Sequence, residues 1–264
     1  MKIPVFLYFV FFSLLGKISF AKDIIFNAYY ENSEQPPYYL GNTKKVPENP
    51  GVAVEMVKSL EKNIRNFKVK FTRTPWARCK KNLEKGIADG IFNASFKKAR
   101  LKIGLYPWKN GEVDTARRIT KLSYSLYFLK SSKLSWNGKN LSGITGPIAA
   151  PAGYSIVDDL RKKYNKKVEE APTTRNNFMM LLNKRVHAVA AQTVTGDFLL
   201  QSQENKFGKS IVKDPIPLVK KPYYLMISKS FQKKHPKLTE QIWNKIKEIR
   251  EKNLEKLILK YNDI

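Results

Sequence analysis

Apolar positions in the first half of the chain alternate between the period of strands and the longer period of helices. After Gly51, apolar residues recur at positions 52, 56, 57, 60 and 64, which is the spacing of one helical face. The predicted order is a strand at 23–28, a helix at 52–64, a strand at 67–71, a helix at 76–83 that Gly86 ends, and a strand at 87–94. This order is typical of a mostly parallel sheet with helices on its faces.

The same pattern returns in the second half of the chain. Strand-like runs are predicted at 126–129, 141–150, 168–171 and 188–191, with helices at 156–164 and 176–182. An extended segment at 215–222, a strand at 223–228 and an amphipathic helix at 238–261 follow. This order predicts a second lobe that is inserted between two parts of the first.

The insertion predicts specific boundaries. We expect lobe 1 at residues 22–122 and 224–264 and lobe 2 at residues 126–217. The chain must then cross twice between the lobes, and the extended segments near 123–125 and 218–223 are the predicted hinge. The fold class is therefore α/β with two lobes, each a mostly parallel sheet flanked by helices.

Residues 1–21 have the pattern of an export signal. Lys2 gives a basic start, residues 4–16 are almost wholly apolar, and Ser19 and Ala21 are the small residues that a cleavage site requires. The apolar run is shorter than the roughly 20 residues of a spanning helix, and an uncleaved membrane anchor is the alternative. We expect a signal peptide at 1–21, a mature chain that begins near Lys22, and a periplasmic location.

The chain has a large excess of basic residues. It holds 49 lysines and arginines against 22 acidic residues, a net charge of +27, and removal of Lys2 and Lys17 with the signal leaves 47 against 22, or +25. Such an excess is common in nucleic-acid binders, but these lysines are spread along the chain and mixed with glutamates, as at 240–260. We therefore expect no nucleic-acid partner. A solvated lysine-rich surface is the first interpretation, and attraction to anionic envelope surfaces is the second.

The sequence lacks the residue sets of a metal or catalytic centre. Cys79 is the only cysteine, so no intramolecular disulfide can form, and its side chain is either buried or paired between chains. The two histidines, His187 and His235, lie 48 residues apart. No serine nucleophile motif and no glycine-rich phosphate loop occurs. We expect no cofactor, no metal and no catalytic group.

Candidate chemistry concentrates in the stretch GIADGIFNASFKKARLKIGLYP at 86–107. Asn93 and Ser95 stand where its predicted strand ends, and in open α/β sheets ligands bind outside the carboxyl ends of the strands. Arg100 follows five residues after Ser95 and offers a planar fork that matches a carboxylate. In the alternative interpretation Ser95 caps a helix and Arg100 is a solvated charge; the residues alone favour neither.

Five short stretches give the chain a resemblance to a known family. They are QPPY at 35–38, PGVAVEM at 50–56, PWAR at 75–78, GIAD at 86–89 with the serine and arginine that follow it, and LNKRVHA at 182–188. In this order and spacing they resemble the periplasmic solute-binding proteins of the polar amino-acid type, the receptors of ABC importers. The resemblance covers about residues 23–261. It implies the two-lobed periplasmic-binding-protein fold (type II), a small polar solute as ligand, an inner-membrane ABC permease as partner, and a monomer.

The resemblance also implies roles for individual residues. Arg100 and Ser95 have the spacing of the pair that holds the ligand's carboxylate in this family. Aromatic residues that enclose the ligand correspond to Tyr38 and Trp76. A glycine turn at a helix start, which supplies backbone donors, corresponds to Gly153, Tyr154 and Ser155. The predicted ligand-binding residues are these together with Asn93, Tyr29 and Gln192.

Two of these positions depart from the family pattern. Tyr29 and Gln192 stand where amino-acid binders usually place acids that pair with the ligand's ammonium. A buried ammonium without an anionic partner costs several kcal/mol, so an ordinary α-amino acid is a weaker expectation than a modified amino acid, an organic acid or a short peptide. His187 replaces an acid at a strand entry and is interpreted as structural.

Two other classes of function stay open. Some relatives of this fold are dehydratases, which need a general acid or base, and the nearest acidic candidates are Glu31, Glu34 and Asp89. A sensory or envelope-binding protein without transport is the other alternative. The expected function is capture of a small polar, carboxylate-bearing solute, amino-acid-like or an organic acid, between the lobes for an ABC importer.

Overall fold

The computed structural model describes residues 23–201 and 206–262. The export signal predicted at 1–21 and the mature start predicted at Lys22 lie outside the described residues. Within the described part of the chain, no helix is both long and apolar enough to cross a membrane.

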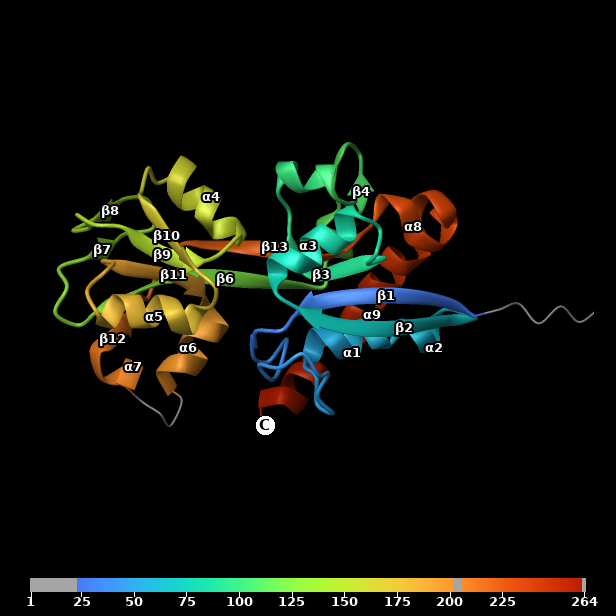
Figure 1. The fold of residues 1–264 in the computed structure, drawn as a ribbon, viewed down its shortest axis with the longest axis horizontal. Helices are drawn as coiled ribbons and strands as arrows, with labels where there is room; N and C mark the ends of the chain where they lie inside the picture. The colour runs from blue at the N-terminus through green and yellow to red at the C-terminus, as the bar shows by residue number, and fades with distance from the viewer. Residues whose placement is uncertain (1–22, 202–205, 263–264) are drawn as a thin grey trace, which may run out of the picture.

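One sheet of nine strands, built from the described residues, runs through the molecule (Figure 1). Its order is β10-β9-β11-β6-β13-β3-β1-β2, and β12 pairs with β6 beside this path. Its strands are β1 (Ile24–Glu31), β2 (Phe67–Thr74), β3 (Gly90–Ser95), β6 (Thr120–Leu129), β9 (Ile148–Pro151), β10 (Val168–Ala171), β11 (Ala188–Gln192), β12 (Ile211–Lys213) and β13 (Val219–Ile227). Two small hairpins pair β4 (Trp108–Lys109) with β5 (Glu112–Val113) and β7 (Ser135–Trp136) with β8 (Leu141–Ser142).

Helices cover this sheet in two groups. The α-helices are α1 (Val52–Lys58), α2 (Leu60–Asn63), α3 (Trp76–Glu84), α4 (Ser155–Lys162), α5 (Thr174–Leu182), α6 (Thr193–Gln201), α7 (Lys206–Ser210), α8 (Lys229–Lys234) and α9 (Pro236–Asn262). Short 3-10 helices are η1 (Lys98–Lys102) and η2 (Thr115–Arg117). The helices α1, α2, α8 and α9 pack together, whereas α5 and α6 pack on β9, β11 and β6.

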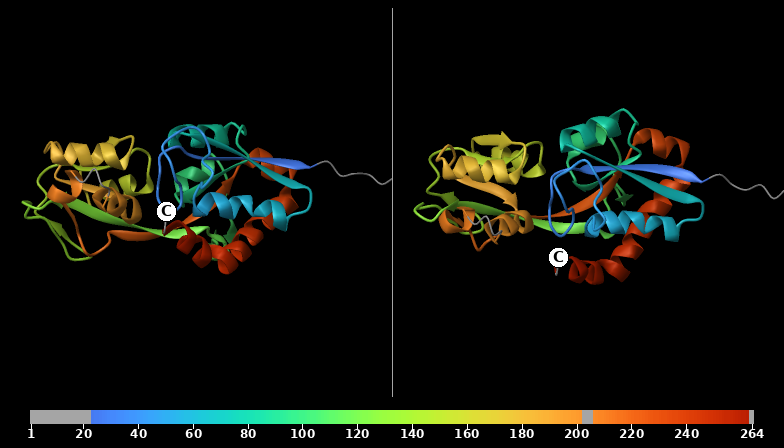
Figure 2. Two further views of the ribbon diagram at one scale, coloured as in Figure 1. Left: turned by 90° about the horizontal axis from the view of Figure 1, so that it is seen from below. Right: turned by 60° about the horizontal axis from the view of Figure 1, so that its bottom comes forward.

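Figures 1 and 2 show the two lobes that these groups define. The first lobe contains β1, β2 and β3 with α1, α2, α3, α8 and α9, and the second contains β9 to β12 with α4 to α7. Within the first lobe β1 is parallel to β2 and β3, and within the second β9 is parallel to β10 and β11. The mostly parallel, two-lobed α/β class expected from the sequence is therefore confirmed.

The connection between the lobes differs from the expectation of two separate sheets. The segments predicted as a hinge lie inside β6 and β13, which pass from one lobe to the other and pair antiparallel from Val219 opposite Tyr124 to Tyr223 opposite Thr120. β6 also pairs with β11, and β13 with β3, so hydrogen bonding continues from lobe to lobe. The first half of β6 contains polar residues and no continuous apolar run, so the sequence pattern predicted a strand only at 126–129.

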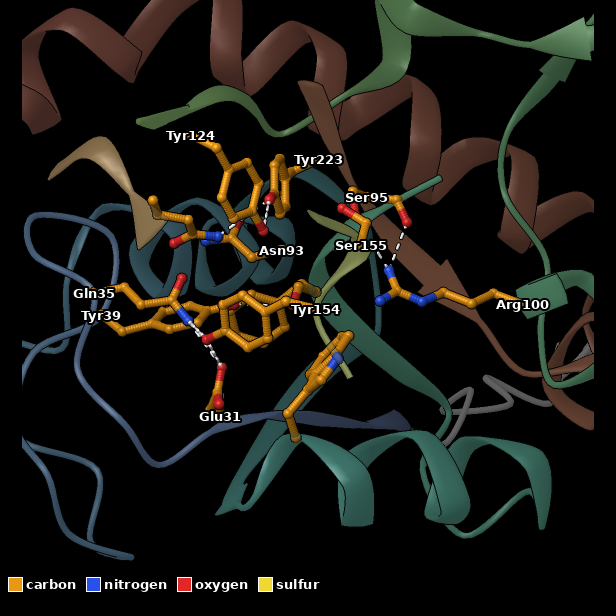
Figure 3. Close-up of a pocket in the computed structure, with 13 residues that line it drawn as sticks. Glu31, Gln35, Tyr39, Asn93, Ser95, Arg100, Tyr124, Tyr154, Ser155 and Tyr223 are labelled. Atoms are coloured by element: carbon orange, nitrogen blue, oxygen red, sulfur yellow. Dashed lines mark hydrogen bonds between the residues drawn. The ribbon is translucent and has the colours of Figure 1, made fainter. Parts of the chain in front are cut away.

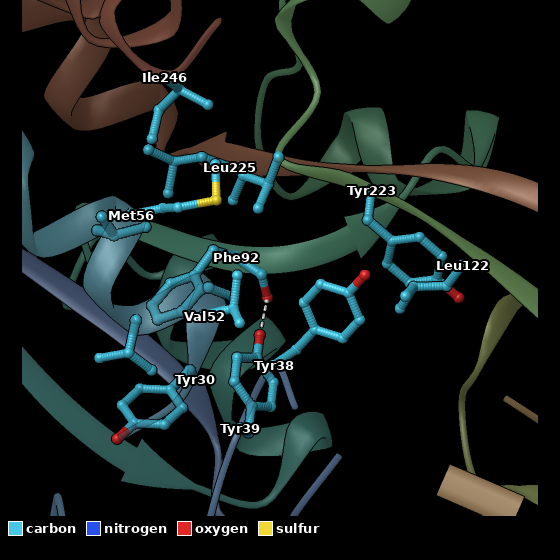
Figure 4. Packing of buried hydrophobic residues seen from close by; sticks show 14 of the residues in the cluster. Tyr30, Tyr38, Tyr39, Val52, Met56, Phe92, Leu122, Tyr223, Leu225 and Ile246 are labelled. Atoms are coloured by element: carbon cyan, nitrogen blue, oxygen red, sulfur yellow. Dashed lines mark hydrogen bonds between the residues drawn. The ribbon is translucent and has the colours of Figure 1, made fainter. Parts of the chain in front are cut away.

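The largest hydrophobic cluster joins both lobes and is densest in the first (Figure 4). Phe92 on β3 lies 5.2 Å from the ring of Tyr30 and 5.7 Å from that of Tyr39, and it accepts a 2.9 Å hydrogen bond from the Tyr39 hydroxyl at its backbone oxygen. Met56 of α1 and Ile246 of α9 are fully buried above them. These contacts fix the loop after β1, which contributes to the candidate site.

A glycine closes that loop. Gly51 has φ +105°, and a Cβ there would lie 2.5 Å from the backbone oxygen of Tyr38. Backbone hydrogen bonds join the same two segments of the loop: Val52 N donates to Pro37 O at 2.9 Å, and Leu40 N donates to Pro50 O at 3.1 Å. Only glycine allows the backbone to approach this closely.

Gly51→Ala should therefore destabilise the protein by on the order of 3 kcal/mol, because left-handed strain adds to a backbone clash. The measurement is urea unfolding. Gly111→Ala is the matched control, since Gly111 has φ +81° but nothing within 4 Å of an added Cβ; it should lose only about 1 kcal/mol. Equal losses in the two variants would contradict the close approach.

Candidate ligand-binding site

A cavity lies between the lobes, where strands from both end (Figure 3). Its walls come from β1, β3, β6, β11 and β13, from the loop after β1, and from the starts of α3 and α4. The lining residues are Glu31, Gln35, Tyr39, Trp76, Phe92, Asn93, Ser95, Arg100, Tyr124, Tyr154, Ser155, Gln192 and Tyr223. This is the location at which open α/β sheets place ligands.

Arg100 lies in η1 and reaches across the cavity to the second lobe. Its guanidinium donates to Ser95 O at 2.7 Å and to Ser95 Oγ at 3.3 Å, and it donates to Gly153 O at 3.2 Å. It also lies 5.5 Å from the ring centroid of Trp76, a cation–π distance. No carboxylate of the described residues lies within ion-pair distance, although the side chain is 6% exposed. The guanidinium is thus held in place by neutral acceptors and keeps an uncompensated charge.

Several amide groups in the cavity have no hydrogen-bond partner. Both side-chain polar atoms of Asn93 are unpartnered, and so are Oε1 of Gln192 and Oε1 of Gln35. These three side chains are 7%, 3% and 4% exposed. Asn93 also has φ +53°, a conformation that costs free energy in a non-glycine residue. A buried polar group without a partner costs about 1–3 kcal/mol, so such a cluster is typical of a binding site.

Glu31 connects the two lobes. Its carboxylate accepts hydrogen bonds from the Tyr154 hydroxyl at 2.5 Å and from Nε2 of Gln35 at 2.8 Å, as Figure 3 shows. Nε2 of Gln35 also donates to the Tyr154 hydroxyl oxygen at 2.7 Å. Burial raises the pKa of Glu31 to about 7, and these two hydrogen bonds and the charge of Lys80 oppose the rise. The site therefore holds one carboxyl group that can gain or lose a proton near neutral pH.

Hydroxyl groups from the crossing strands form the opposite wall. The Tyr223 hydroxyl donates to the Tyr124 hydroxyl at 2.8 Å and accepts from Nε2 of Gln192 at 3.1 Å. Burial raises the pKa of both phenols. Both tyrosines therefore stay neutral and act as hydrogen-bonding groups.

Basic residues surround the cavity. Lys97 forms a 2.5 Å ion pair with Asp158, and Lys221 forms one with Asp159, each between the first lobe or β13 and α4. Burial together with the charges of Arg100 and Lys97 lowers the pKa of Lys80. The field near Arg100 thus favours an anionic ligand group. In the described part of the chain no cluster of acidic, histidine and cysteine side chains could hold a metal ion.

An outer chamber of about 360 Å³ adjoins the cavity and shares Gln35, Tyr154 and Gln192 with it. The free volume of the inner cavity is only about 10 Å³, which is the space of one water molecule. The remaining walls of the outer chamber come from the loop after β1 and from the starts of α5 and α6.

Most residues singled out from the sequence come together here. Seven of the ten line the inner cavity: Trp76, Asn93, Ser95, Arg100, Tyr154, Ser155 and Gln192. Gly153 contacts Arg100 through its carbonyl, but its N–H donates to Glu170 at 2.8 Å, and the N–H of Tyr154 donates to Pro151 O. The helix-start donors expected at 153 and 154 are thus used within the protein.

Tyr29 and Tyr38 lie elsewhere. Tyr29 packs against the cluster around Trp76 and Cys79, on the α3 side of the sheet. Tyr38 accepts a 3.0 Å hydrogen bond from Thr120 Oγ1, and its neighbour Tyr39 lines the cavity instead. The expectation that Tyr29 marks the end of the first strand is wrong, because β1 continues to Glu31. An acid, Glu31, therefore does stand at the end of the first strand. The sequence analysis inferred that both acids of the family pattern are missing, and only the one at Gln192 is.

Other expectations have simpler outcomes. Ser95 does not cap a helix, since η1 begins after Lys97 without a side-chain cap. Cys79 is buried and free. Nδ1 of His187 accepts from Gly146 N at 3.1 Å, which fits a structural residue. Sequence analysis missed Gln35, Tyr39, Phe92, Tyr124 and Tyr223 as lining residues; strand alternation continued through β6 would have indicated Tyr124.

Comparison with known proteins identifies the fold. No protein-family model and no curated protein matches the sequence. A histidine kinase sensor domain with similarity to periplasmic binding proteins is 15% identical, with a TM-score of 0.71 over 91% of this chain and 96% of that one. The GluR0 ligand-binding core from Nostoc punctiforme, solved with L-glutamate, is 15% identical, with a TM-score of 0.66 over 90% and 100%. An ancestral amino-acid-binding protein, a precursor of cyclohexadienyl dehydratase, is 15% identical, with a TM-score of 0.65 over 90% and 94%. The chain therefore has the two-lobed periplasmic-binding-protein fold.

Glu31 should make stability depend on pH within a defined window. Its folded-state pKa of about 7 exceeds the ordinary value of 4.5, so between these pH values the folded state keeps a proton that the unfolded state has lost. The contribution of this group is full below about pH 4.5 and is lost as the pH rises to about 7. From pH 5 to pH 7.5 the wild type should therefore lose more unfolding free energy than Glu31→Gln, by on the order of 2 kcal/mol, measured by urea unfolding.

Glu34→Gln is the matched control for this experiment. It removes a half-buried carboxylate of the same loop and should keep the wild-type dependence on pH. The interpretation fails if Glu31→Gln and the wild type change in parallel.

Proposed function

We propose that this protein captures a small polar, carboxylate-bearing solute between its lobes and presents it to a membrane partner. The partner is an ABC permease of the inner membrane, and the chain acts in the periplasm as a monomer after its signal peptide is removed. The observation that carries the proposal is Arg100, a buried guanidinium that faces the interlobe cavity without a carboxylate partner. A carboxylate on the ligand would complete its charge pairing through a planar two-point contact.

Closure of the lobes supplies the mechanism. We propose lobe boundaries at 22–122 with 224–264 and at 126–217, with the paired part of β6 and β13 as the hinge. Contacts that cross the cleft include three pairs: Arg100 with Gly153, Glu31 with Tyr154, and Lys97 with Asp158. A ligand favours the closed form only through contacts that it makes better there, and these three pairs lie beside the place where it would make them.

The same cavity supports a second candidate function. Glu31 is buried, and its pKa of about 7 suits a general acid or base that works near neutral pH. One structural neighbour is a precursor of a dehydratase. Dehydration of the bound solute is therefore the alternative function of this cavity. A sensory role, as in the histidine kinase sensor domain, would change the membrane partner and leave the binding site the same.

Small-angle scattering with a panel of amino acids, organic acids and short peptides tests capture. A true ligand should reduce the radius of gyration by shifting the population toward the closed form. The same mixtures are followed by mass spectrometry for product. Conversion of the solute to a dehydrated product would contradict the binding function and support the enzymatic one.

Arg100→Ala should weaken binding of the captured solute by roughly tenfold to several hundredfold, since a charge-assisted hydrogen bond contributes about 1.5–3 kcal/mol. Arg100→Lys should restore only part, because an ammonium lacks the planar fork. Ser95→Ala should lose less than Arg100→Ala, since a hydroxyl is a neutral partner. Calorimetric titration measures all three, and circular dichroism checks the fold. Unchanged affinity in Arg100→Ala would falsify the carboxylate contact.

A further inference from the structure

The volumes of the two connected spaces restrict how a ligand can lie. The inner cavity beside Arg100 has about 10 Å³ of free space and the outer chamber about 360 Å³. Ligand sites for small molecules usually have at least about 300 Å³. A ligand held at Arg100 by one end must therefore place most of its atoms in the outer chamber.

The groups at the junction of the two spaces are neutral acceptors. Gln35 and Gln192 line both spaces, and the Oε1 atom of each is buried without a partner. Their nitrogens are already used, by Glu31 and Tyr154 for Gln35 and by Tyr223 for Gln192. A neutral N–H of the ligand would satisfy these oxygens, whereas a buried ammonium would need an anion. Glu31 accepts two hydrogen bonds there, both at Oε2, and because burial raises its pKa to about 7 it is only partly ionised near neutral pH and is a weak partner for an ammonium.

The second lobe offers donors to the outer chamber. Both α5 and α6 begin at its wall, where Thr173, Thr174 and Thr195 line it. The first N–H groups of a helix have no partner within its backbone, although in α5 the N–H of Asn176 already donates to the Thr173 hydroxyl. The hydroxyl of Thr195 is also unpartnered, and its side chain is only 6% exposed. These groups suit a carbonyl oxygen a few bonds away from the N–H at the junction.

The lining of the outer chamber also carries charge and apolar surface. Glu34 lines it from the first lobe, and Phe198, 41% exposed, lines it from α6. Arg175 lines it from α5, with its guanidinium 5.7 Å from the ring centroid of Phe207. A carboxylate attracts an ammonium at a solvated edge, and an exposed ring offers surface to an apolar side chain. Across the two spaces the lining offers a cation at Arg100, neutral acceptors at the junction, donors on the second lobe, and in the outer chamber both an anion, Glu34, and a second cation, Arg175.

With Glu34 as the anion, these groups are complementary to those of a short peptide read from its C-terminus: carboxylate, N–H, carbonyl and ammonium. We propose, building on the carboxylate-binding function above, that the ligand is a dipeptide whose C-terminal carboxylate lies at Arg100 and whose peptide N–H faces Gln192 and Gln35. The peptide carbonyl faces the starts of α5 and α6, and the terminal ammonium lies toward Glu34. In a dipeptide the α-nitrogen of the C-terminal residue is an uncharged amide. The neutral Gln192 can accept a hydrogen bond from it, and no carboxylate is needed at this position.

Competition within one mixture tests the proposal. The full chain is incubated with all common L-amino acids and all dipeptides made from them, and native mass spectrometry identifies what it retains. Dipeptides should be retained in preference to free amino acids. Retention of free amino acids, or of nothing in the mixture, would overturn the proposal.

Analogues of the retained dipeptide then test the individual contacts. An ester in place of the peptide bond removes the N–H and should weaken binding by about tenfold, since an unsatisfied buried acceptor costs about 1–3 kcal/mol. Thr195→Val, an isosteric loss of the hydroxyl, should weaken the dipeptide several-fold and leave any residual binding of the matching free amino acid unchanged. An ester that binds as tightly as the peptide would overturn the assignment of the N–H.

Arg100→Ala separates this inference from the function on which it rests. If free amino acids or organic acids bind the wild type more tightly than dipeptides do and lose affinity in Arg100→Ala, the carboxylate function stands and the dipeptide inference fails. If no carboxylate solute depends on Arg100, both fail.

Discussion

Antiparallel pairing between β6 and β13 is the constraint on which the positions of both lobes depend. Each strand belongs to the sheet of one lobe and then crosses into the other, so any rotation of the lobes must be absorbed within the pairs between Thr120–Tyr124 and Val219–Tyr223. Two-stranded ribbons accept more twist than wide sheets do. Tyr124 and Tyr223 also project from this ribbon into the cavity. The proposed hinge is therefore also a wall of the cavity, and the closure proposed above would move the hydroxyls of Tyr124 and Tyr223 directly.

The sequence predicted the fold well wherever burial imposes a simple period. The α/β order and β10 at Val168–Ala171 follow from the pattern of apolar residues. The pattern failed where a strand carries polar residues for another reason. Thr120–Tyr124 mixes polar and apolar residues in the part of β6 that pairs with β13. The helix α6 was missed because Gly196 interrupts its pattern; a Cβ at Gly196 would lie 2.2 Å from the Tyr127 ring.

The candidate site was predictable in part for the same physical reason. Asn93 and Ser95 stand at the end of a buried strand and Arg100 follows it, and the end of such a strand faces the crevice. Glu31 was not placed there because the sequence does not mark where β1 stops, and a strand that is two residues longer brings a different side chain to its end. Tyr39 lines the cavity in place of Tyr38, because Tyr38 lies in the tight turn between Gln35 and Tyr39 and its hydroxyl is bonded to Thr120. The sequence does not show which of two adjacent aromatic residues such a turn directs toward the cavity.

Cys79 gives the molecule a built-in chemical reporter. The only thiol of the chain is fully buried in α3, where it donates a 3.4 Å hydrogen bond to the Thr74 carbonyl, and burial raises its pKa. α3 also carries Trp76, against which Arg100 is stacked. A thiolate reacts only when it is exposed and deprotonated, so the rate of alkylation by a small reagent measures how often α3 detaches from the sheet. That helix forms one wall of the cavity, so a ligand that holds the helix in place would slow the alkylation of Cys79.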